Sequence, residues 1–101
     1  MKLYIDTSSI QKAIIKFDDE VFETESRKDK SQTLLPFIEQ ELSKRDLTFH
    51  DITEIEIATG PGSFTGLRVG LSIAQALAWI LHIPLNGKRI DHGEHIPLSY
   101  S

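Results

Sequence analysis

Hydrophobic and polar residues alternate in several segments of the chain, and this alternation predicts β-strands. Residues 2–6, KLYID, alternate as a half-buried strand does, with Leu3 and Ile5 on one face. The segments QKAIIKF and EVFETES are joined by the acidic turn DDE, which predicts a β-hairpin. Residues 51–60, DITEIEIATG, alternate again, and a short last strand is expected near residues 83–90, IPLNGKRI.

Apolar residues at helical spacing predict two helices. The first is expected to begin at Asp29 or Ser31 as its N-cap, with Pro36 early enough in the helix to be tolerated. Its apolar positions are Leu34, Leu35, Phe37, Ile38 and Leu42. The second helix is expected from about Ser63 to His82, directly after a glycine-rich loop.

This order of elements, β-β-β-α-β-α-β, predicts an α/β fold with a mixed five-stranded sheet. Crossover connections are right-handed, so two crossovers in the same direction place both helices on one face of the sheet. The alternating strands agree with this, because a sheet covered on both faces has continuously apolar strands. We expect the lobe to span residues 1–90, followed by a tail at residues 91–101, DHGEHIPLSYS.

Composition narrows the classes of protein to which the chain can belong. Its 101 residues suffice for one domain with one core. The sequence has no cysteine, which excludes disulfides and thiolate metal sites. The net charge is -4 and the basic residues are scattered, which argues against binding nucleic acid without a partner. No apolar run is long enough to cross a membrane, and we expect a cytoplasmic location.

The glycine-rich loop ATGPGSFTGLRVG, residues 58–70, is the main candidate for chemistry. It lacks the lysine of a P-loop and the spacing of a dinucleotide fingerprint. A helix N-terminus after a glycine turn still offers free amides and a positive dipole end to an anion. The alternative is that Gly-Pro-Gly makes a tight turn and that a serine caps the helix. The candidate anion- or nucleotide-binding residues are Asp6, Thr7, Gly60, Gly62, Ser63 and Thr65.

The second helix has two apolar stripes, although a surface helix needs only one. A bulky stripe is expected to face the sheet and contains Val69, Ile73, Leu77 and Ile80. A stripe of small residues lets another backbone approach closely, and we interpret it as a contact surface for a partner's helix. The alternative is that this stripe packs on the chain's own first helix. The candidate interface, from both helices, consists of Leu34, Phe37, Ile38, Leu42, Gly66, Gly70, Ala74 and Ala78.

No catalytic or metal site can be assembled from the sequence. The HExxH and HxxxH patterns of zinc sites do not occur, and the cluster DHGEH at residues 91–95 is expected to be solvated. Asp6, Thr7 and Ser8 either contact a phosphate or metal or form an Asx turn that opens the hairpin. No nucleophile, base and orienting acid can be grouped together. We therefore expect the chain alone not to be an enzyme.

Three segments together resemble the TsaB (YeaZ) family, over about residues 2–90: YIDTSS, LLPFI and the long motif GPGSFTGLRVGLSIAQALA. The resemblance implies a ribonuclease-H-like lobe of the actin and sugar-kinase type. It also implies a non-catalytic scaffold and dimerisation subunit that supports TsaD in forming N6-threonylcarbamoyladenosine (t6A) at adenosine 37 of tRNA. The family's loop carries over onto residues 60–66, and its second helix onto residues 67–81.

The resemblance implies partners as well. The two helices would pack on a TsaD-like catalytic subunit or on a second copy of the chain, with a TsaE-like ATPase in the complex and tRNA held only through partners. No cofactor is expected on the chain alone, and ATP only in the assembled complex. Typical members have a second lobe, which these 101 residues do not contain, and a histidine often seen entering the first helix is replaced around residues 30–32. The competing hypothesis is a small nucleotide- or phosphate-binding enzyme of the actin and sugar-kinase superfamily.

Overall fold

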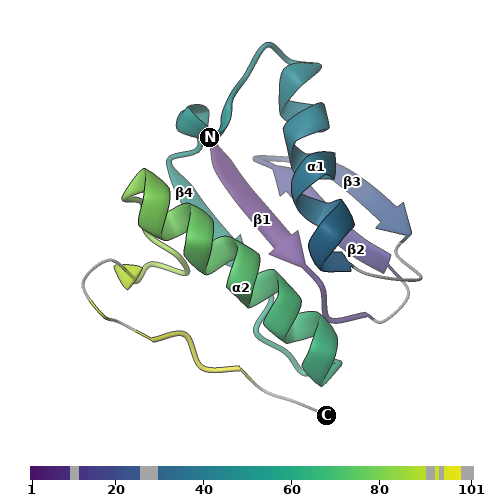
Figure 1. Cartoon of the computed structure of the whole chain (residues 1–101), viewed down its shortest axis with the longest axis vertical. Helices are drawn as coiled ribbons and strands as arrows, with labels where there is room; N and C mark the ends of the chain where they lie inside the picture. The colour runs from purple at the N-terminus through teal and green to yellow at the C-terminus, as the bar shows by residue number, and fades with distance from the viewer. Residues whose placement is uncertain (10–11, 26–29, 91–92, 94, 99–101) are drawn as a thin grey trace.

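The strands of the structure form one mixed sheet. The computed structural model describes residues 1–9, 12–25, 30–90, 93 and 95–98. β1 (Lys2–Asp6) lies between β2 (Lys12–Phe17) and β4 (Glu54–Ile57), and β3 (Glu20–Glu25) follows β2 at the edge (Figure 1). β1 pairs antiparallel with β2 and parallel with β4, and β2 pairs antiparallel with β3. The expected hairpin and the mixed sheet are confirmed.

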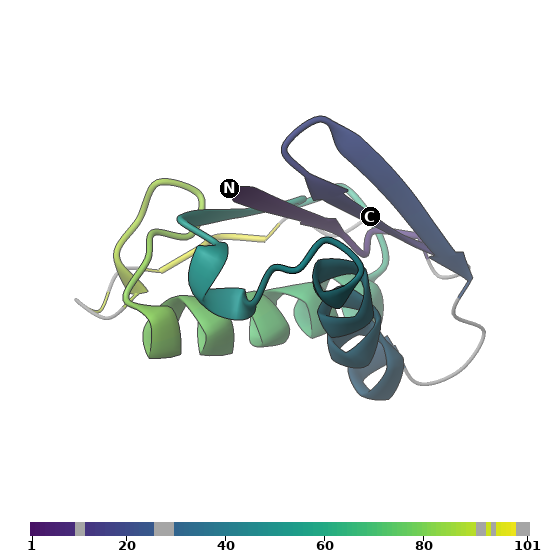
Figure 2. The ribbon, with the colours of Figure 1, turned by 90° about the horizontal axis from the view of Figure 1, so that it is seen from above.

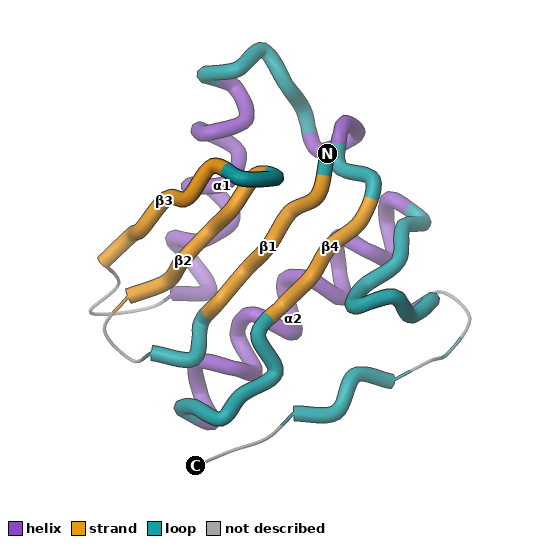
Figure 3. The backbone as a smooth tube through the Cα atoms, turned by 180° about the vertical axis from the view of Figure 1, so that it is seen from behind, coloured by secondary structure: helices purple, strands orange, loops and turns teal. Residues whose placement is uncertain are grey.

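Both helices lie on the same face of this sheet. α1 (Lys30–Ser43) and α2 (Phe64–Leu81) are below the strands in Figure 2, with the short 3-10 turn η1 (Phe49–Asp51) on the same side. In the part of the chain that the structure describes, no helix covers the opposite face (Figure 3). The one-sided arrangement expected from right-handed crossovers is therefore confirmed.

The alternation of the strands separates these two faces. Leu3, Ile5, Ile55 and Ile57 point toward the helices and are buried. On the other face, Lys2 Nζ lies 2.8 Å from Glu56 Oε2, and the Lys16 ammonium lies 5.1 Å from the centre of the Tyr4 ring. Exposed ion pairs of this kind contribute at most about 1 kcal/mol each, so burial of the apolar face supplies most of the stability of the sheet.

α1 packs through one apolar stripe, Leu34, Ile38 and Leu42, all of which are buried. Their spacing of four residues puts them on one side of the helix. Pro36 lies inside α1 beyond its first turn, so the expectation that it falls at the helix start was wrong. Proline removes one N–H from the helical hydrogen bonds, and the exposed position of Pro36 keeps this defect away from the core.

The prediction of a fifth strand at residues 83–90 was wrong. In the described part of this segment, only Leu85 bridges β4, at Ile55. Asn86 and Gly87 have φ angles of 49° and 75°, and the chain turns back so that Leu85 N donates to Lys88 O at 2.8 Å. Positive φ at two successive residues defines a type I′ turn, for which Asn-Gly is the preferred pair. Turn chemistry therefore ends the strand after one bridge.

The side chain of Asn86 takes the place of the missing strand. Its Oδ1 accepts a hydrogen bond from Ile57 N at 2.7 Å, and its Nδ2 donates to Ile57 O at 3.3 Å. The carboxamide thus presents one acceptor and one donor, as a backbone peptide of a neighbouring strand would. At this point on the outer edge of β4, the backbone N–H and C=O groups of Ile57 are hydrogen-bonded by an amide side chain.

Part of the segment after residue 90 belongs to the core. Ile96 is buried with the main apolar cluster, and Lys88 Nζ donates to the carbonyl of His95 at 3.1 Å. Residues 91, 92 and 94 of the DHGEH cluster lie outside the described residues. The domain boundary after residue 90 stays a prediction, but the burial of Ile96 shows that the chain still contributes to the core at this position.

Candidate functional site

The glycine-rich loop joins β4 to α2 at the carboxyl ends of two parallel strands, β1 and β4 (Figure 1). The loop therefore lies beside the residues that follow β1. Ser63 N donates to Ser8 O at 3.0 Å, and a Cβ on Gly62 would lie 2.7 Å from the Ser8 Cβ. Real Cβ atoms do not approach other atoms this closely, so glycine at position 62 lets the two loops touch.

Ser63 caps the N-terminus of α2. Its Oγ accepts a hydrogen bond from Gly66 N at 3.3 Å, and its carbonyl accepts one from Leu67 N at 2.9 Å. Gly60 turns the chain before the cap with a φ of 112°, which residues with a side chain rarely adopt. These contacts support the interpretation of the loop as a tight turn with a capping serine.

Asp6, at the end of β1, forms an Asx turn with Ser8, which was one of the two roles predicted for this segment. Asp6 Oδ1 accepts hydrogen bonds from Ser8 N at 2.9 Å and from Ser8 Oγ at 2.6 Å. Thr7 is buried beneath α2, and Thr65 is exposed on the first turn of the helix. The structure thus brings the candidate anion-binding residues to one end of the sheet, where Asp6 and Ser63 both bond to Ser8. Anion binding at Asp6, Thr7, Gly60, Gly62, Ser63 and Thr65 stays a prediction.

The replacement Ser63→Ala tests the capping role. We expect the free energy of unfolding to fall by roughly 0.5–2 kcal/mol, because a helix N-terminal amide loses its acceptor. Urea denaturation followed by circular dichroism measures this, with Ser72→Ala at an exposed position within α2 as the control. If stability is unchanged and a phosphate titration followed by NMR is lost, the loop is an anion site instead.

The small-residue stripe of α2 faces the chain's own sheet. Ala74 and Ala78 are fully buried. A Cβ on Gly66 would collide with the Thr7 carbonyl oxygen, and a Cβ on Gly70 would collide with Thr7 Oγ1. The absence of side chains at these two glycines lets α2 approach the end of β1. The prediction that Gly66, Gly70, Ala74 and Ala78 form a surface for a partner's helix was therefore wrong.

The predicted interface residues of α1 need the same correction. Leu34, Ile38 and Leu42 are buried in the core beneath the sheet, and only Phe37 is half-buried. Periodicity identified these residues as one apolar stripe, but a core stripe and a partner-binding stripe have the same spacing. In the isolated chain, Phe37 is the one predicted interface residue with a partly accessible side chain.

A second apolar strip of α2 is accessible instead. We call it the outer strip; it consists of Val69, Ile73, Ala76 and Ile80, which share one side of the helix by their spacing. Val69 and Ile73 are half-buried, whereas Ala76 is exposed and the Ile80 side chain is 67% exposed. Trp79, beside the strip, is 56% exposed. The sequence assigned the bulky stripe to the sheet, which is correct for Leu77 and in part for Ile73, whose side chain packs against the core, and wrong for Ile80. Ala76 and Trp79 were missed.

Comparison with known proteins gives the chain its family. The family model for TsaD, tRNA N6-adenosine threonylcarbamoyltransferase, matches residues 8–94. The chain belongs to this family. Bacillus subtilis tRNA threonylcarbamoyladenosine biosynthesis protein TsaB is 36% identical over 88 residues, which cover 83% of this chain and 38% of the relative. The tRNA N6-adenosine threonylcarbamoyltransferase of Clostridioides difficile is 40% identical over 86 residues, which cover 84% of this chain and 25% of the relative.

A solved structure of the same family agrees with the fold. YeaZ from Pseudomonas aeruginosa matches with a TM-score of 0.71 and 25% sequence identity, over 83% of this chain and 41% of that protein. The resemblance to TsaB (YeaZ) proteins is therefore confirmed. The chain spans 38% of the length of TsaB from Bacillus subtilis and 42% of the length of TsaB from Buchnera aphidicola of Schizaphis graminum.

The described part of this TsaB-like chain offers neither a metal site nor a membrane-spanning helix. No group of three or more histidine, cysteine, aspartate or glutamate residues is placed to hold a metal ion in the part of the chain that the structure describes. Neither of the helices at 30–43 and 64–81, within the described ranges, is long and apolar enough to cross a membrane.

Proposed function

We propose that this chain is an accessory subunit in t6A biosynthesis and supports a TsaD-like catalytic subunit without catalysing a reaction itself. The family match and the TsaB-named relatives support the pathway. The mixed sheet with two helices on one face supports a ribonuclease-H-like lobe, formed by residues 1–90, of the actin and sugar-kinase type. The observation that most supports a scaffold role is the exposed outer strip of α2.

The outer strip has the chemistry of a helix-to-helix contact. α2 already buries one side against β1 and β4, through Leu67, Ala74 and Ala78. The outer strip adds a further apolar surface with Ile80 and the neighbouring Trp79 largely exposed to water. Isolated exposed apolar residues are common, but a continuous strip along a helix that ends in an exposed tryptophan is typical of a binding surface.

The same proposal covers the other members of the complex. The TsaD-like subunit would pack against α2 and the accessible part of α1, and a second copy of the chain could occupy the same surface in a homodimer. A TsaE-like ATPase would join the assembly, with ATP bound only there, and tRNA would be held by the partners because this chain is acidic overall. A cytoplasmic location is part of this proposal.

Reconstitution of the modification reaction tests the function. The chain alone should neither hydrolyse ATP nor modify tRNA, because the polar groups at the loop serve the turn and the helix cap: Asp6 Oδ1 accepts two hydrogen bonds from Ser8, and Ser63 Oγ accepts one from Gly66 N. Addition of the chain to its TsaD-like and TsaE-like partners and threonylcarbamoyl-adenylate should raise the t6A content of tRNA, measured by mass spectrometry of nucleosides. ATP turnover by the isolated chain that is lost in Asp6→Ala would contradict the proposal and favour a small nucleotide-binding enzyme.

A further inference from the structure

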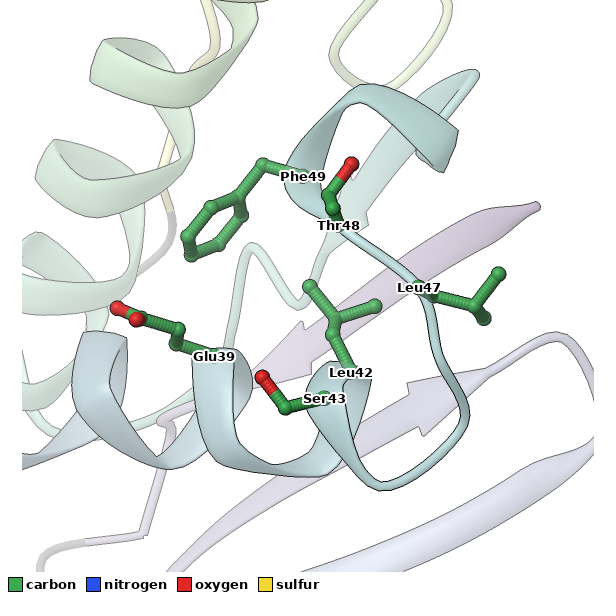
Figure 4. Close-up of a pocket in the computed structure, with 6 residues that line it drawn as sticks. All are labelled: Glu39, Leu42, Ser43, Leu47, Thr48 and Phe49. Atoms are coloured by element: carbon green, nitrogen blue, oxygen red, sulfur yellow. The ribbon is translucent and has the colours of Figure 1, made fainter.

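A surface pocket lies between the C-terminal half of α1 and the segment that contains η1. It has a volume of about 310 Å³ and is lined by Glu39, Leu42, Ser43, Leu47, Thr48 and Phe49 (Figure 4). The apolar part comes from two leucines and one phenylalanine, and the polar part from one carboxylate and two hydroxyls. Figure 4 shows the Glu39 side chain and the Phe49 ring on the side of the pocket nearest α2, with the Glu39 carboxylate pointing toward that helix. The elements that line this pocket, α1 and the segment with η1, lie on the helical side of the sheet, the side of the proposed partner contact (Figure 2).

The electrostatics of the pocket favour a cation. The Glu39 side chain is exposed and has no ion pair with any other described residue. Behind Thr48, the Asp51 carboxylate accepts the Thr48 N–H at 2.8 Å and adds a second negative charge. Ser43 is the last residue of α1, where the helix dipole presents its negative end. A basic group would meet negative potential from all three sources.

The chain already contains an arginine bound by the same chemistry on the other side of α1. Arg45 Nη2 lies 2.7 Å from Glu20 Oε2 and Arg45 Nη1 lies 3.3 Å from Glu41 Oε2, while the guanidinium is 4.5 Å from the centre of the Phe22 ring. Hydrogen bonding from Lys44, together with Arg45, holds the pKa of Glu41 below its usual value. This site combines a carboxylate of α1 with an aromatic ring and an arginine. The pocket combines a carboxylate of α1, Glu39, with the ring of Phe49 and lacks the arginine.

We propose that the pocket receives an arginine side chain of the protein partner. The aliphatic part of that arginine would lie on Leu47 and Phe49, and its guanidinium would bond to Glu39. Arginine fits better than lysine, because its planar group can stack on an aromatic ring while it donates two hydrogen bonds to a carboxylate. The proposal rests on the proposed function, since the arginine would belong to the TsaD-like subunit.

Calorimetric titration with the TsaD-like subunit tests the pocket through two variants and one control. Glu39→Gln keeps the size of the side chain and removes its charge, so the affinity should fall roughly tenfold and depend less on salt. Phe49→Leu should weaken binding severalfold, because the ring is lost while the apolar floor remains. Glu54→Gln, on the opposite face of the sheet, should bind as the wild type does. Unchanged affinity in Glu39→Gln would overturn the proposal that the pocket binds an arginine, while leaving the proposed function intact.

A small probe separates failure of the pocket from failure of the proposed function. Nα-acetyl-arginine amide should shift the NMR signals of Leu42, Ser43, Thr48 and Phe49 in the wild-type chain but not in Glu39→Gln. Nα-acetyl-citrulline amide, which has the same shape without the charge, should shift none of them. If the wild-type chain does not bind the TsaD-like subunit, the proposed function fails, and shifts with the arginine probe would still support the pocket. The lack of such shifts would overturn the pocket.

Discussion

Replacing Gly66 with alanine should destabilise the chain by about 3 kcal/mol, at the upper end of the cost of overpacking. The added Cβ would collide with the Thr7 carbonyl oxygen, which belongs to the backbone at the end of β1 and cannot rotate away. For a domain of this size, such a loss lowers the melting temperature by roughly 10–25 °C. Thermal unfolding followed by circular dichroism measures it. The sign of the change in stability is informative, because alanine within a helix is otherwise about 1 kcal/mol more favourable than glycine.

Gly70→Ala provides a matched comparison in the same helix. Its Cβ would meet the Thr7 side chain, at Oγ1, rather than the backbone. Thr7→Ala should therefore restore much of the stability lost in Gly70→Ala, and little of that lost in Gly66→Ala. Ser72→Ala, at an exposed position of α2, is expected to be neutral or slightly stabilising. A Gly66→Ala chain as stable as the wild type would show that α2 does not pack this closely on β1.

The elements and their layering could be predicted because their signals are local. Strict alternation fixed the faces of β1 and β4, and the acidic turn at residues 18–19 defined the hairpin. Right-handed crossovers then placed both helices on one face. The prediction of the last strand was wrong for an equally local reason. Asn86 and Gly87 form a hairpin turn within the segment that was interpreted as a strand. The Asn-Gly pair in the sequence already indicated a turn at this position.

The orientation of α2 could not be predicted, because two apolar stripes on one helix are equivalent until its distance from the sheet is known. Bulky side chains fill a wide gap, and small ones fit a narrow gap. The loop ties the first turn of α2 to Ser8 through Ser63 N, so the helix begins close to β1 and the gap at Gly66 and Gly70 is narrow. That tie is a contact between residues far apart in the sequence. Once it is known, Ala76 and Ile80 are expected to face away from the sheet, as their exposure shows.

Ile80→Lys should leave the chain folded and weaken its association with the TsaD-like subunit by roughly 30-fold or more. Ile80 is 67% exposed, so the change removes little apolar burial from the chain's own core. A lysine near the C-terminus of a helix interacts favourably with the helix dipole, which protects the stability of α2. In the complex, however, the charge would replace an apolar contact and lose its water, and central apolar contacts of an interface are worth about 2 kcal/mol or more.

The comparison that decides this prediction uses two further variants. Trp79→Ala removes the aromatic ring beside the outer strip and should also reduce affinity. Glu54→Lys introduces a lysine at an exposed position of β4, on the opposite face of the sheet, and should bind as the wild type does. Melting temperatures of all three variants exclude unfolding as the cause, and analytical ultracentrifugation with and without the TsaD-like subunit measures association. If Ile80→Lys and Glu54→Lys bind equally well, the outer strip is not the contact surface, because a charge buried in an apolar contact lowers the affinity.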